Sequence, residues 1–433
     1  QNDCKIREYL KLQDFYYNGY YRLSELSVII KVYFFADSQK YVKYLRNIKE
    51  GCVFMDGFIE LFSNFGELKW QMVVMWIIGA ILIYLAIKKD MEPALLLPMG
   101  FGAILVNIPW SGAVTQAYET GIEHGPIDVL FNAGIANELF PLLLFIGIGA
   151  MIDFGPLLSN PKMMLFGAAA QFGIFFTLSL STLLSFDLKD AASIAIIGAA
   201  DGPTSIFVSQ YFNSKYVGPI IVAAYSYMAL VPIIQPPVIR LITTKKERCI
   251  KMPYKPSSVS KTTRIIFPIA ITLIAGIIAP RSVALVGFLM FGNLIRECGV
   301  LNSLSESAQK ELANLITLLL GITVSTKMQY EAFLSVETIM IMGLGLVAFI
   351  FDTVGGVFFA KFLNLFTKNK INPMVGAAGI SAFPMSSRVV HKMGQQEDPE
   401  NYLLMHAAAA NVSGQIASVI AGGLIISLVA NRI

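Results

Sequence analysis

The stretch Ala191–Gln210, Ala-Ala-Ser-Ile-Ala-Ile-Ile-Gly-Ala-Ala-Asp-Gly-Pro-Thr-Ser-Ile-Phe-Val-Ser-Gln, places one carboxylate and a helix-breaking pair inside an otherwise apolar run. Gly202 and Pro203 interrupt a helix, because proline lacks an N–H donor and clashes with the preceding turn. The apolar runs on either side are about ten residues long. A helix that crosses a bilayer needs about 20 residues, so each run is half of a span. The stretch therefore predicts a discontinuous membrane helix with Asp201 at the break.

The rest of the chain has the composition of a membrane protein. Of its 433 residues, 55% are hydrophobic and 14% are charged, whereas about 25% of the residues in a soluble domain are charged. Four runs are long enough to span a bilayer: Trp70–Ile87, Met163–Phe186, Gly218–Ile242 and Thr338–Ala360. Shorter or overlapping candidates are Pro141–Ile152, Ile265–Ala279 and Tyr402–Ala430. We expect an all-α, multi-pass membrane protein with about ten to twelve spanning or half-spanning helices.

Basic residues gather in one connection, residues 244–264, where Glu247 is the only acidic residue. They are Lys245, Lys246, Arg248, Lys251, Lys255, Lys261 and Arg264. Because cytoplasmic loops are enriched in lysine and arginine, we expect this loop in the cytoplasm and no nucleic-acid partner. The cysteines Cys4, Cys52, Cys249 and Cys298 are scattered, so neither a disulfide framework nor a zinc site is indicated.

Short motifs recur in the same order on both sides of this loop. Ala94-Leu95 with Phe101-Gly102 returns as Ala284-Leu285 with Phe291-Gly292, and Gly198–Ala200 returns as Gly376–Ala378. We interpret residues 55–243 and 265–433 as two inverted repeats, joined by the basic loop 244–264. Residues 1–54 form an N-terminal appendage of unknown role, and Met55 is a plausible start. Transporters built from inverted repeats bind their cargo near the midplane, where helices break.

Asp201 is the first candidate for cation binding, because ionisable residues inside a membrane are costly and mostly functional. The alternative is an ordinary Asp-Gly-Pro turn at the end of a span. A second break, Gly376–Pro384, offers hydroxyl and carbonyl oxygens that suit a hard cation such as sodium. Arg388 follows it, either as a helix-end cation near lipid headgroups or as a ligand for a carboxylate.

Other polar groups in the apolar runs keep two interpretations each. Tyr225 either anchors packing through its hydroxyl or belongs to a site. Asp352 is either a second membrane carboxylate or marks the end of a span. The run Tyr402–Ala430 also contains Asn411, Ser413 and Gln415.

Five motifs resemble the β subunits of sodium-pumping, biotin-dependent decarboxylases, which act on oxaloacetate, methylmalonyl-CoA or glutaconyl-CoA. They are Ala200–Thr204, Ala224–Pro232, Lys370–Pro373, Gly147–Pro156 and His406–Gln415. The resemblance extends from about Met55 to the C-terminus, and the segment before Met55 departs from the family's pattern.

The resemblance implies a membrane subunit that decarboxylates carboxybiotin, takes up a proton and exports sodium across a bacterial cytoplasmic membrane. It implies a biotin-carrying carboxyltransferase and a small single-span membrane subunit as partners, and a homo-oligomer. In the family, the positions matching Asp201, Tyr227 and Ser381 handle sodium and protons. Asn372 and Gly376 match positions lining a second site, and Arg388 matches the position associated with carboxybiotin. We expect sodium ligands among Asp201, Tyr227, Asn372, Gly376, Ser381, Asn411 and Ser413, and contacts with carboxybiotin at Arg388 and Asn372.

Two other functions remain open from the residues alone. A secondary transporter, such as a sodium–carboxylate symporter or a cation/proton antiporter, also uses repeated broken helices. A purely structural anchor is the third possibility, and a carboxylate in a half-span counts against it.

Overall fold

The computed structural model describes residues 64, 66–89, 91–118, 121–253 and 259–432. The chain divides into two units, Gln1–Glu67 and Leu68–Ile433, and the fold below is that of the second. The predicted appendage, residues 1–54, and the possible start at Met55 lie outside the described residues.

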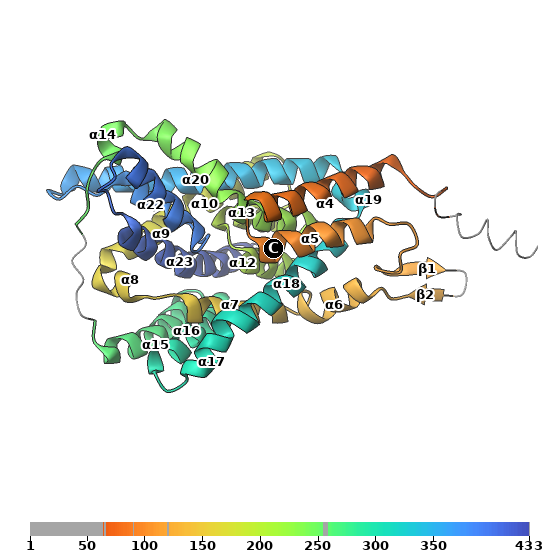
Figure 1. The fold of residues 1–433 in the computed structure, drawn as a ribbon, viewed down its shortest axis with the longest axis horizontal. Coiled ribbons are helices and arrows are strands. Elements are labelled where there is room, and N and C mark those ends of the chain that lie inside the picture. Colours follow the sequence, from red (N-terminus) through yellow and green to blue (C-terminus); the bar gives the residue numbers. More distant parts are fainter. Residues whose placement is uncertain (1–63, 65, 90, 119–120, 254–258, 433) are drawn as a thin grey trace, which may run out of the picture. The chain divides into compact units, whose positions relative to one another are not determined.

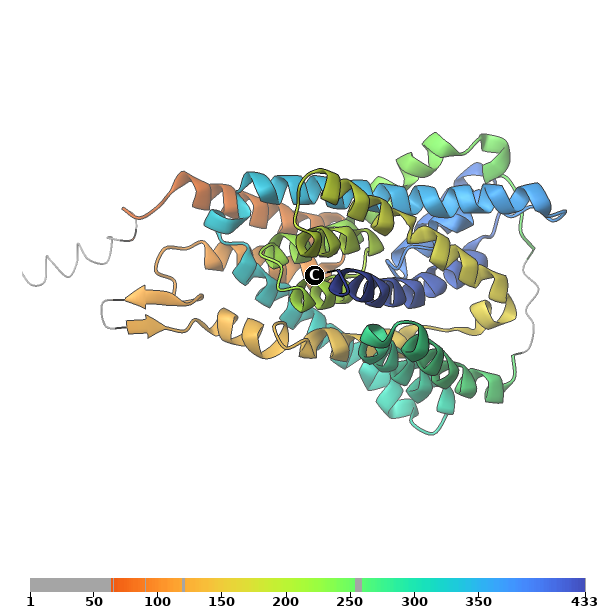
Figure 2. The same cartoon turned by 180° about the vertical axis from the view of Figure 1, so that it is seen from behind.

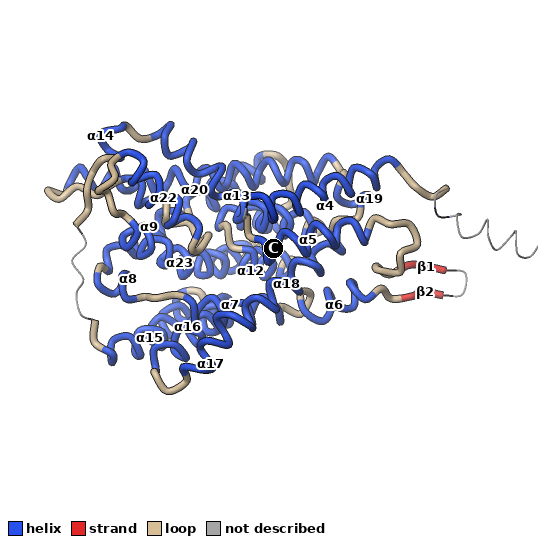
Figure 3. Tube along the Cα trace, viewed as in Figure 1, coloured by secondary structure: helices blue, strands red, loops and turns tan. Residues whose placement is uncertain are grey.

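Helices dominate Leu68–Ile433, and the hairpin β1–β2 holds the only strands in the described ranges (Figure 3). Up to the basic loop, the elements are α4 Trp70–Lys89, α5 Pro93–Val106, β1 Gln116–Tyr118, β2 Gly121–Glu123, α6 Pro126–Gly134, α7 Leu139–Met151, α8 Gly155–Ser159, η2 Pro161–Met163, α9 Met164–Ala170, α10 Phe172–Leu183, α11 Leu188–Ala195, η3 Ile196–Ala199, α12 Gly202–Tyr211 and α13 Val217–Ile242.

The remaining elements begin with α14 Lys245–Arg248 in the basic loop. They continue as α15 Lys261–Ile278, η4 Pro280–Ser282, α16 Val283–Cys298, α17 Asn302–Ser307, η5 Ala308–Leu312, α18 Ala313–Val324, η6 Ser325–Lys327, α19 Tyr330–Phe333, α20 Val336–Phe366, α21 Pro373–Ala377, α22 Met385–Glu397 and α23 Leu404–Ala430.

Six helices of the described chain are long and apolar enough to cross a membrane: α4, Pro161–Leu183, α13, α15, α20 and α23. A seventh span results if α6 and α7, which bend by 64°, are counted together. The all-α, multi-pass prediction is confirmed, and so are the four runs predicted as full spans. The runs around α15 and α23, predicted as shorter or overlapping candidates, are also long enough to span.

Helices α7 and α16 pack with almost no space between their backbones. A Cβ added at Gly149 would lie 1.8 Å from the Leu289 carbonyl oxygen, and one at Gly292 would lie 2.1 Å from that of Ile146. Lipid tails are as apolar as leucine side chains, so close packing through small residues is a main force that joins helices in a membrane. These two glycines therefore hold a helix from before the basic loop against one from after it.

Helices α5 and α18 make a corresponding contact elsewhere in the bundle. A Cβ at Gly321 would lie 2.7 Å from the Leu95 carbonyl oxygen, and one at Gly102 would lie 2.3 Å from Ser325 Oγ. Again a helix from before the basic loop packs on one from after it. The parts of the chain on the two sides of the loop are interleaved rather than folded separately.

The ends of this unit differ in character (Figures 1 and 2). One end, here called the basic-loop end, holds α14, and Arg248 pairs there with Glu397 at the end of α22 at 2.6 Å. The opposite end carries β1 and β2 and is called the hairpin end. Helix α13 runs from the hairpin end to the basic-loop end, whereas α23 starts at the basic-loop end, where His406 contacts the Met252 carbonyl oxygen at 3.2 Å.

The close contact of α7 with α16 predicts a large effect of one methyl group. In Gly149→Ala the Cβ overlaps the backbone of Leu289, so overpacking should cost about 1–3 kcal/mol. Gly343→Ala in α20 is the matched control, because nothing lies within 4 Å of its added Cβ. We expect thermal unfolding in detergent to occur several degrees lower for Gly149→Ala only. Equal melting temperatures would contradict this packing.

Candidate functional site

The helix that contains Asp201 is interrupted in the way the sequence predicts. Element η3 ends at Ala199, Ala200 takes the left-handed conformation with φ +51°, and Asp201 is extended before α12 begins at Gly202. Pro203 lies in the first turn of α12, where its missing N–H costs no helical hydrogen bond. The break therefore exposes backbone and the Asp201 side chain at the junction of two short helices.

Asp201 lies in the interior of the protein, only 3% exposed. One carboxylate oxygen, Oδ2, accepts hydrogen bonds from Thr204 Oγ1 at 2.6 Å and from Ser418 Oγ at 3.0 Å. Every residue from Asp190 to Ser209 is buried, so a surface turn at the end of a span is wrong for Asp201. The result is a carboxylate with two hydroxyl oxygens beside it, a donor set that suits a hard cation.

The second break lies against the first. Between α21 and α22, Ser381 donates a hydrogen bond from its backbone N–H to the Ala199 carbonyl oxygen at 3.3 Å, and its Oγ donates to the same oxygen. Residues separated by 182 positions thus meet at the point where both helices are interrupted. The Asp201 break and the Gly376–Pro384 break therefore lie side by side in the structure.

Helix α23 presents a polar face to this junction. Asn411 Nδ2 donates to the Ile380 carbonyl oxygen at 2.6 Å, Gln415 Nε2 donates to that of Ser381, and Ser418 reaches Asp201. These three residues have the spacing i, i+4, i+7, which is one face of a helix. The amide oxygens Asn411 Oδ1 and Gln415 Oε1 are buried and accept no hydrogen bond from a described residue.

Two predicted ligands lie elsewhere, as packing residues. Ser413 Oγ donates to the Met163 carbonyl oxygen at 3.0 Å and accepts from the Gly167 N–H at 3.0 Å, so it joins α23 to α9. A Cβ at Gly376 would lie 2.0 Å from the Gly356 carbonyl oxygen, so this residue permits the contact of α21 with α20. Neither residue contacts Asp201.

Asn372 connects the second break to the basic loop. Its Oδ1 accepts from the Met374 N–H at 3.0 Å and caps α21. Its Nδ2 donates to the carbonyl oxygens of Arg248 at 2.8 Å and Ile250 at 2.9 Å. The residue is fully buried, so it fixes the position of the basic loop relative to α21.

The structure does not join Tyr227 or Arg388 to Asp201. The Tyr227 hydroxyl donates to the Met342 carbonyl oxygen of α20 at 2.5 Å. Arg388 is exposed in the first turn of α22, and its guanidinium makes no hydrogen bond or ion pair with any described residue.

Two neighbours of Asp201 were not assigned to the site from sequence. Ser418 lies outside every recognised motif, although its spacing from Asn411 could have indicated it. For Tyr225 the sequence allows either packing or a role in the site. Its ring lies against Gly202, where an added Cβ would be 2.2 Å away, and its buried hydroxyl has no hydrogen-bond partner in the described part of the chain.

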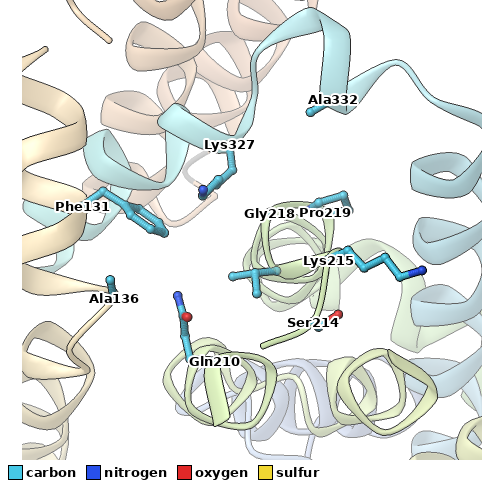
Figure 4. Close-up of a pocket in the computed structure, with 10 residues that line it drawn as sticks. Phe131, Ala136, Gln210, Ser214, Lys215, Gly218, Pro219, Lys327 and Ala332 are labelled. Carbon is cyan, nitrogen blue, oxygen red and sulfur yellow. The ribbon is translucent and has the colours of Figure 1, made fainter. Parts of the chain in front are cut away.

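A cavity of about 320 Å³ lies toward the hairpin end, beyond the C-terminal end of α12. Figure 4 shows Phe131, Gln210 and Lys327 pointing into the same space. The hydroxyls of Ser205 and Ser209 follow Asp201 along α12, with Ser209 Oγ donating to the Ser205 carbonyl oxygen at 2.7 Å. A row of buried polar groups therefore runs from Asp201 toward this cavity.

No group of three or more His, Cys, Asp or Glu side chains able to hold a metal ion occurs in the ranges that the structure describes.

A family model for the "Na+-transporting oxaloacetate decarboxylase beta subunit" matches residues 71–429. The chain belongs to this family. The resemblance expected from the motifs is confirmed.

Three relatives illustrate the range of this β-subunit family. The methylmalonyl-CoA decarboxylase subunit beta of Propionigenium modestum is 47% identical over 84% of this chain and 97% of its own length. The glutaconyl-CoA decarboxylase subunit beta of Acidaminococcus fermentans is 46% identical over 86% of this chain and 96% of its own. A probable oxaloacetate decarboxylase beta chain of Vibrio cholerae is 41% identical over 87% of this chain and 100% of its own.

The anchoring role of Asn372 predicts that its removal loosens the basic loop. Asn372→Ala deletes both donations to the loop, and each net hydrogen bond contributes about 1 kcal/mol, or roughly a factor of five in local opening. We expect trypsin to cleave after Arg248 several-fold faster in detergent-solubilised Asn372→Ala. The exposed neighbour Asn369→Ala should keep the wild-type cleavage rate. Identical rates in both variants would refute the anchoring role.

Proposed function

We propose that this chain is the membrane subunit of a decarboxylase complex, that it cleaves carboxybiotin with uptake of a proton, and that it couples this reaction to sodium export. The observation that carries the proposal is the Asp201 carboxylate, buried beside two hydroxyls where two interrupted helices meet. Membership of a sodium-transporting β-subunit family supports sodium as the cation.

Sodium binds at two adjoining places in this proposal. The first uses Asp201 with the hydroxyls of Thr204 and Ser418. The second uses the Ser381 break with Asn411 Oδ1 and Gln415 Oε1, which are buried oxygens without a donor among the described residues. Sodium prefers oxygen ligands of this kind, as hard cations do. Tyr227, Asn372, Gly376 and Ser413 act on the site through the packing of α20, α21 and α23.

The direction of export follows from the charge of the loops. The basic loop faces the cytoplasm by the positive-inside rule, so the hairpin end and its cavity face outward, in a bacterial cytoplasmic membrane. Sodium then leaves Asp201 along the serines of α12 toward the cavity at Gln210 and Lys327.

Two inverted repeats, residues 55–243 and 265–433, fit the directions of the helices. From the meeting point of the breaks, α12 runs toward the hairpin end, while α22 runs toward Glu397 at the basic-loop end. Helices α13 and α23 are likewise opposed. The contacts of α7 with α16 and of α5 with α18 each join a helix of the first repeat to a helix of the second. Two repeats that exchange equivalent helices would form such a pair of contacts. We count the half-spans around both breaks as further segments, so the proposed architecture keeps about ten to twelve spanning or half-spanning segments.

Carboxybiotin arrives on a biotin-carrying carboxyltransferase subunit, and a small single-span membrane subunit and further copies of this chain complete the complex. Arg388 supports this part of the proposal, because an exposed guanidinium without a partner among the described residues is suited to a carboxylate. In the reaction, the C–N bond of carboxybiotin breaks, CO2 leaves, and the nitrogen keeps the electron pair and takes a proton. Exporting one sodium ion against 100 mV costs about 2.3 kcal/mol, and this cleavage supplies it.

The assembled complex in proteoliposomes tests the proposal against a secondary transporter. In vesicles where the protein is oriented so that it exports sodium into the lumen, we expect the carboxylated substrate to cause sodium to accumulate inside. Avidin should abolish this accumulation, because it captures biotin. Sodium movement that needs only a solute gradient and ignores avidin would favour the symporter or antiporter instead.

Asp201→Asn tests the coupling residue. The amide keeps the size of the side chain and removes its charge, so the variant should insert and assemble but lose sodium-dependent decarboxylation and sodium accumulation. The control Asp187→Asn changes an exposed aspartate that only caps α11, and it should turn over as the wild type does. Wild-type turnover in Asp201→Asn would exclude Asp201 from coupling.

A further inference from the structure

Asp352 is a second carboxylate buried at membrane depth. It lies within α20, which spans Val336–Phe366, and is 1% exposed. At 1.5 Å per residue it is about 20 Å or more from either end of the helix, so it lies near the middle of α20. It is therefore not the span end that the sequence left open as an alternative.

The two oxygens of this carboxyl group have different surroundings. Oδ1 accepts from the Ile174 N–H at 3.2 Å, in the first turn of α10. Oδ2 is buried and has no hydrogen-bond partner in the described ranges. A Cβ added at Gly198 would lie 2.8 Å from Oδ2. The oxygen without a partner therefore lies against η3, the element that leads directly into Asp201.

No described residue neutralises Asp352. The elements α9, α10, α21 and η3, which pack on this part of α20, carry no charged or titratable side chain. Helices α11 and α13 also pack on α20, and their charged or titratable residues are Lys189, Asp190, Tyr225, Tyr227 and Arg240.

The groups on α11 and α13 interact elsewhere. Asp190 accepts from Ser214 Oγ at 2.7 Å, Arg240 donates to Gln396, and Tyr227 donates to Met342. Lys189 is exposed, and the Tyr225 ring lies against Gly202. None of them forms an ion pair with Asp352.

An unpaired carboxylate near the centre of a bilayer is strongly disfavoured, so a proton or a cation must neutralise it. Sodium needs a shell of several oxygens, and the backbone of Gly198 occupies the space next to Oδ2. A proton needs no such shell. The geometry therefore favours a protonated Asp352 in this conformation.

We propose that Asp352, at the place where α20 contacts η3, is a proton carrier of the decarboxylation cycle. This inference rests on the proposed function and assigns the consumed proton to a residue. The Asp352 carboxylic acid loses its proton as the C–N bond of carboxybiotin breaks and the ureido nitrogen takes up a proton. The carboxylate is then reprotonated from the aqueous phase. In this proposal Asp352 supplies the proton through other groups and does not itself touch the reacting atoms.

Asp352→Asn separates this role from a structural one. Asparagine has the same size and keeps an oxygen for the Ile174 N–H, but it cannot carry a proton. We expect decarboxylation by the complete complex to fall about 100-fold or more, the lower range of what positioned proton transfer contributes. Thr353→Val, at the neighbouring buried position whose hydroxyl has no hydrogen-bond partner among the described residues, is the matched control and should keep wild-type turnover.

A conservative variant supplies the second measurement. Asp352→Glu restores a proton-carrying group at a different position, so it should recover part of the turnover with a shifted pH profile. Asp352→Asn turning over within twofold of the wild type, or Asp352→Glu keeping the wild-type pH profile, would overturn the proposal. A wild-type complex that fails the avidin experiment would refute the proposed function itself, whereas these outcomes in a pumping complex refute only the role of Asp352.

Discussion

The hydrogen bonds of Ser381 to the Ala199 carbonyl oxygen are the interaction on which the rest of this structure depends. Interrupted helices leave backbone donors and acceptors that neither lipid nor apolar side chains can satisfy. Here the two breaks satisfy part of each other's backbone, and the polar face of α23 satisfies more. Irregular backbone, a carboxylate and several hydroxyls can therefore coexist in the interior of a membrane protein. The same arrangement leaves oxygens free that a cation can use.

The surrounding helices hold the two breaks together. Glycine contacts join α7 to α16, α5 to α18 and α20 to α21, each at distances that leave no room for a methyl group. Two of these contacts connect helices from opposite sides of the basic loop. Because these contacts join the two sides of the basic loop, a shift of one side would change the geometry at Asp201 and Ser381 together. In the proposed function, such a shift would couple decarboxylation near the basic-loop end to sodium release at the hairpin end.

The sequence predicted the parts of the site that have local signals. Gly202 and Pro203 locate the first break, and the repeated Gly-Ala motif locates the second, because helix interruption depends on the residues at the break itself. The positions of the four long spans followed from hydrophobic length, whereas α15 and α23 proved longer than the candidates expected there. Recognised motifs then named the family, which the comparisons confirm.

What the sequence could not predict depends on contacts between distant elements. Tyr225 and Tyr227 are two residues apart on one helix and so point in different directions, one to Gly202 and the other to Met342. Nothing local distinguishes them. Ser418 reaches Asp201 across 217 positions, while Ser413, inside a recognised motif, packs on α9. The isolation of Asp352 became visible only once α10 and η3 were placed around it.

Sodium binding where the two breaks meet, with Asp201 as the charged ligand, is the proposal on which the other roles depend. Thermal unfolding of the purified protein in sodium compared with potassium at equal ionic strength tests this directly. A ligand at 100 times its dissociation constant stabilises the folded state by about 2.7 kcal/mol. We predict that sodium raises the melting temperature of the wild type and leaves that of Asp201→Asn unchanged. The same sodium-dependent rise in both proteins would contradict sodium binding at Asp201.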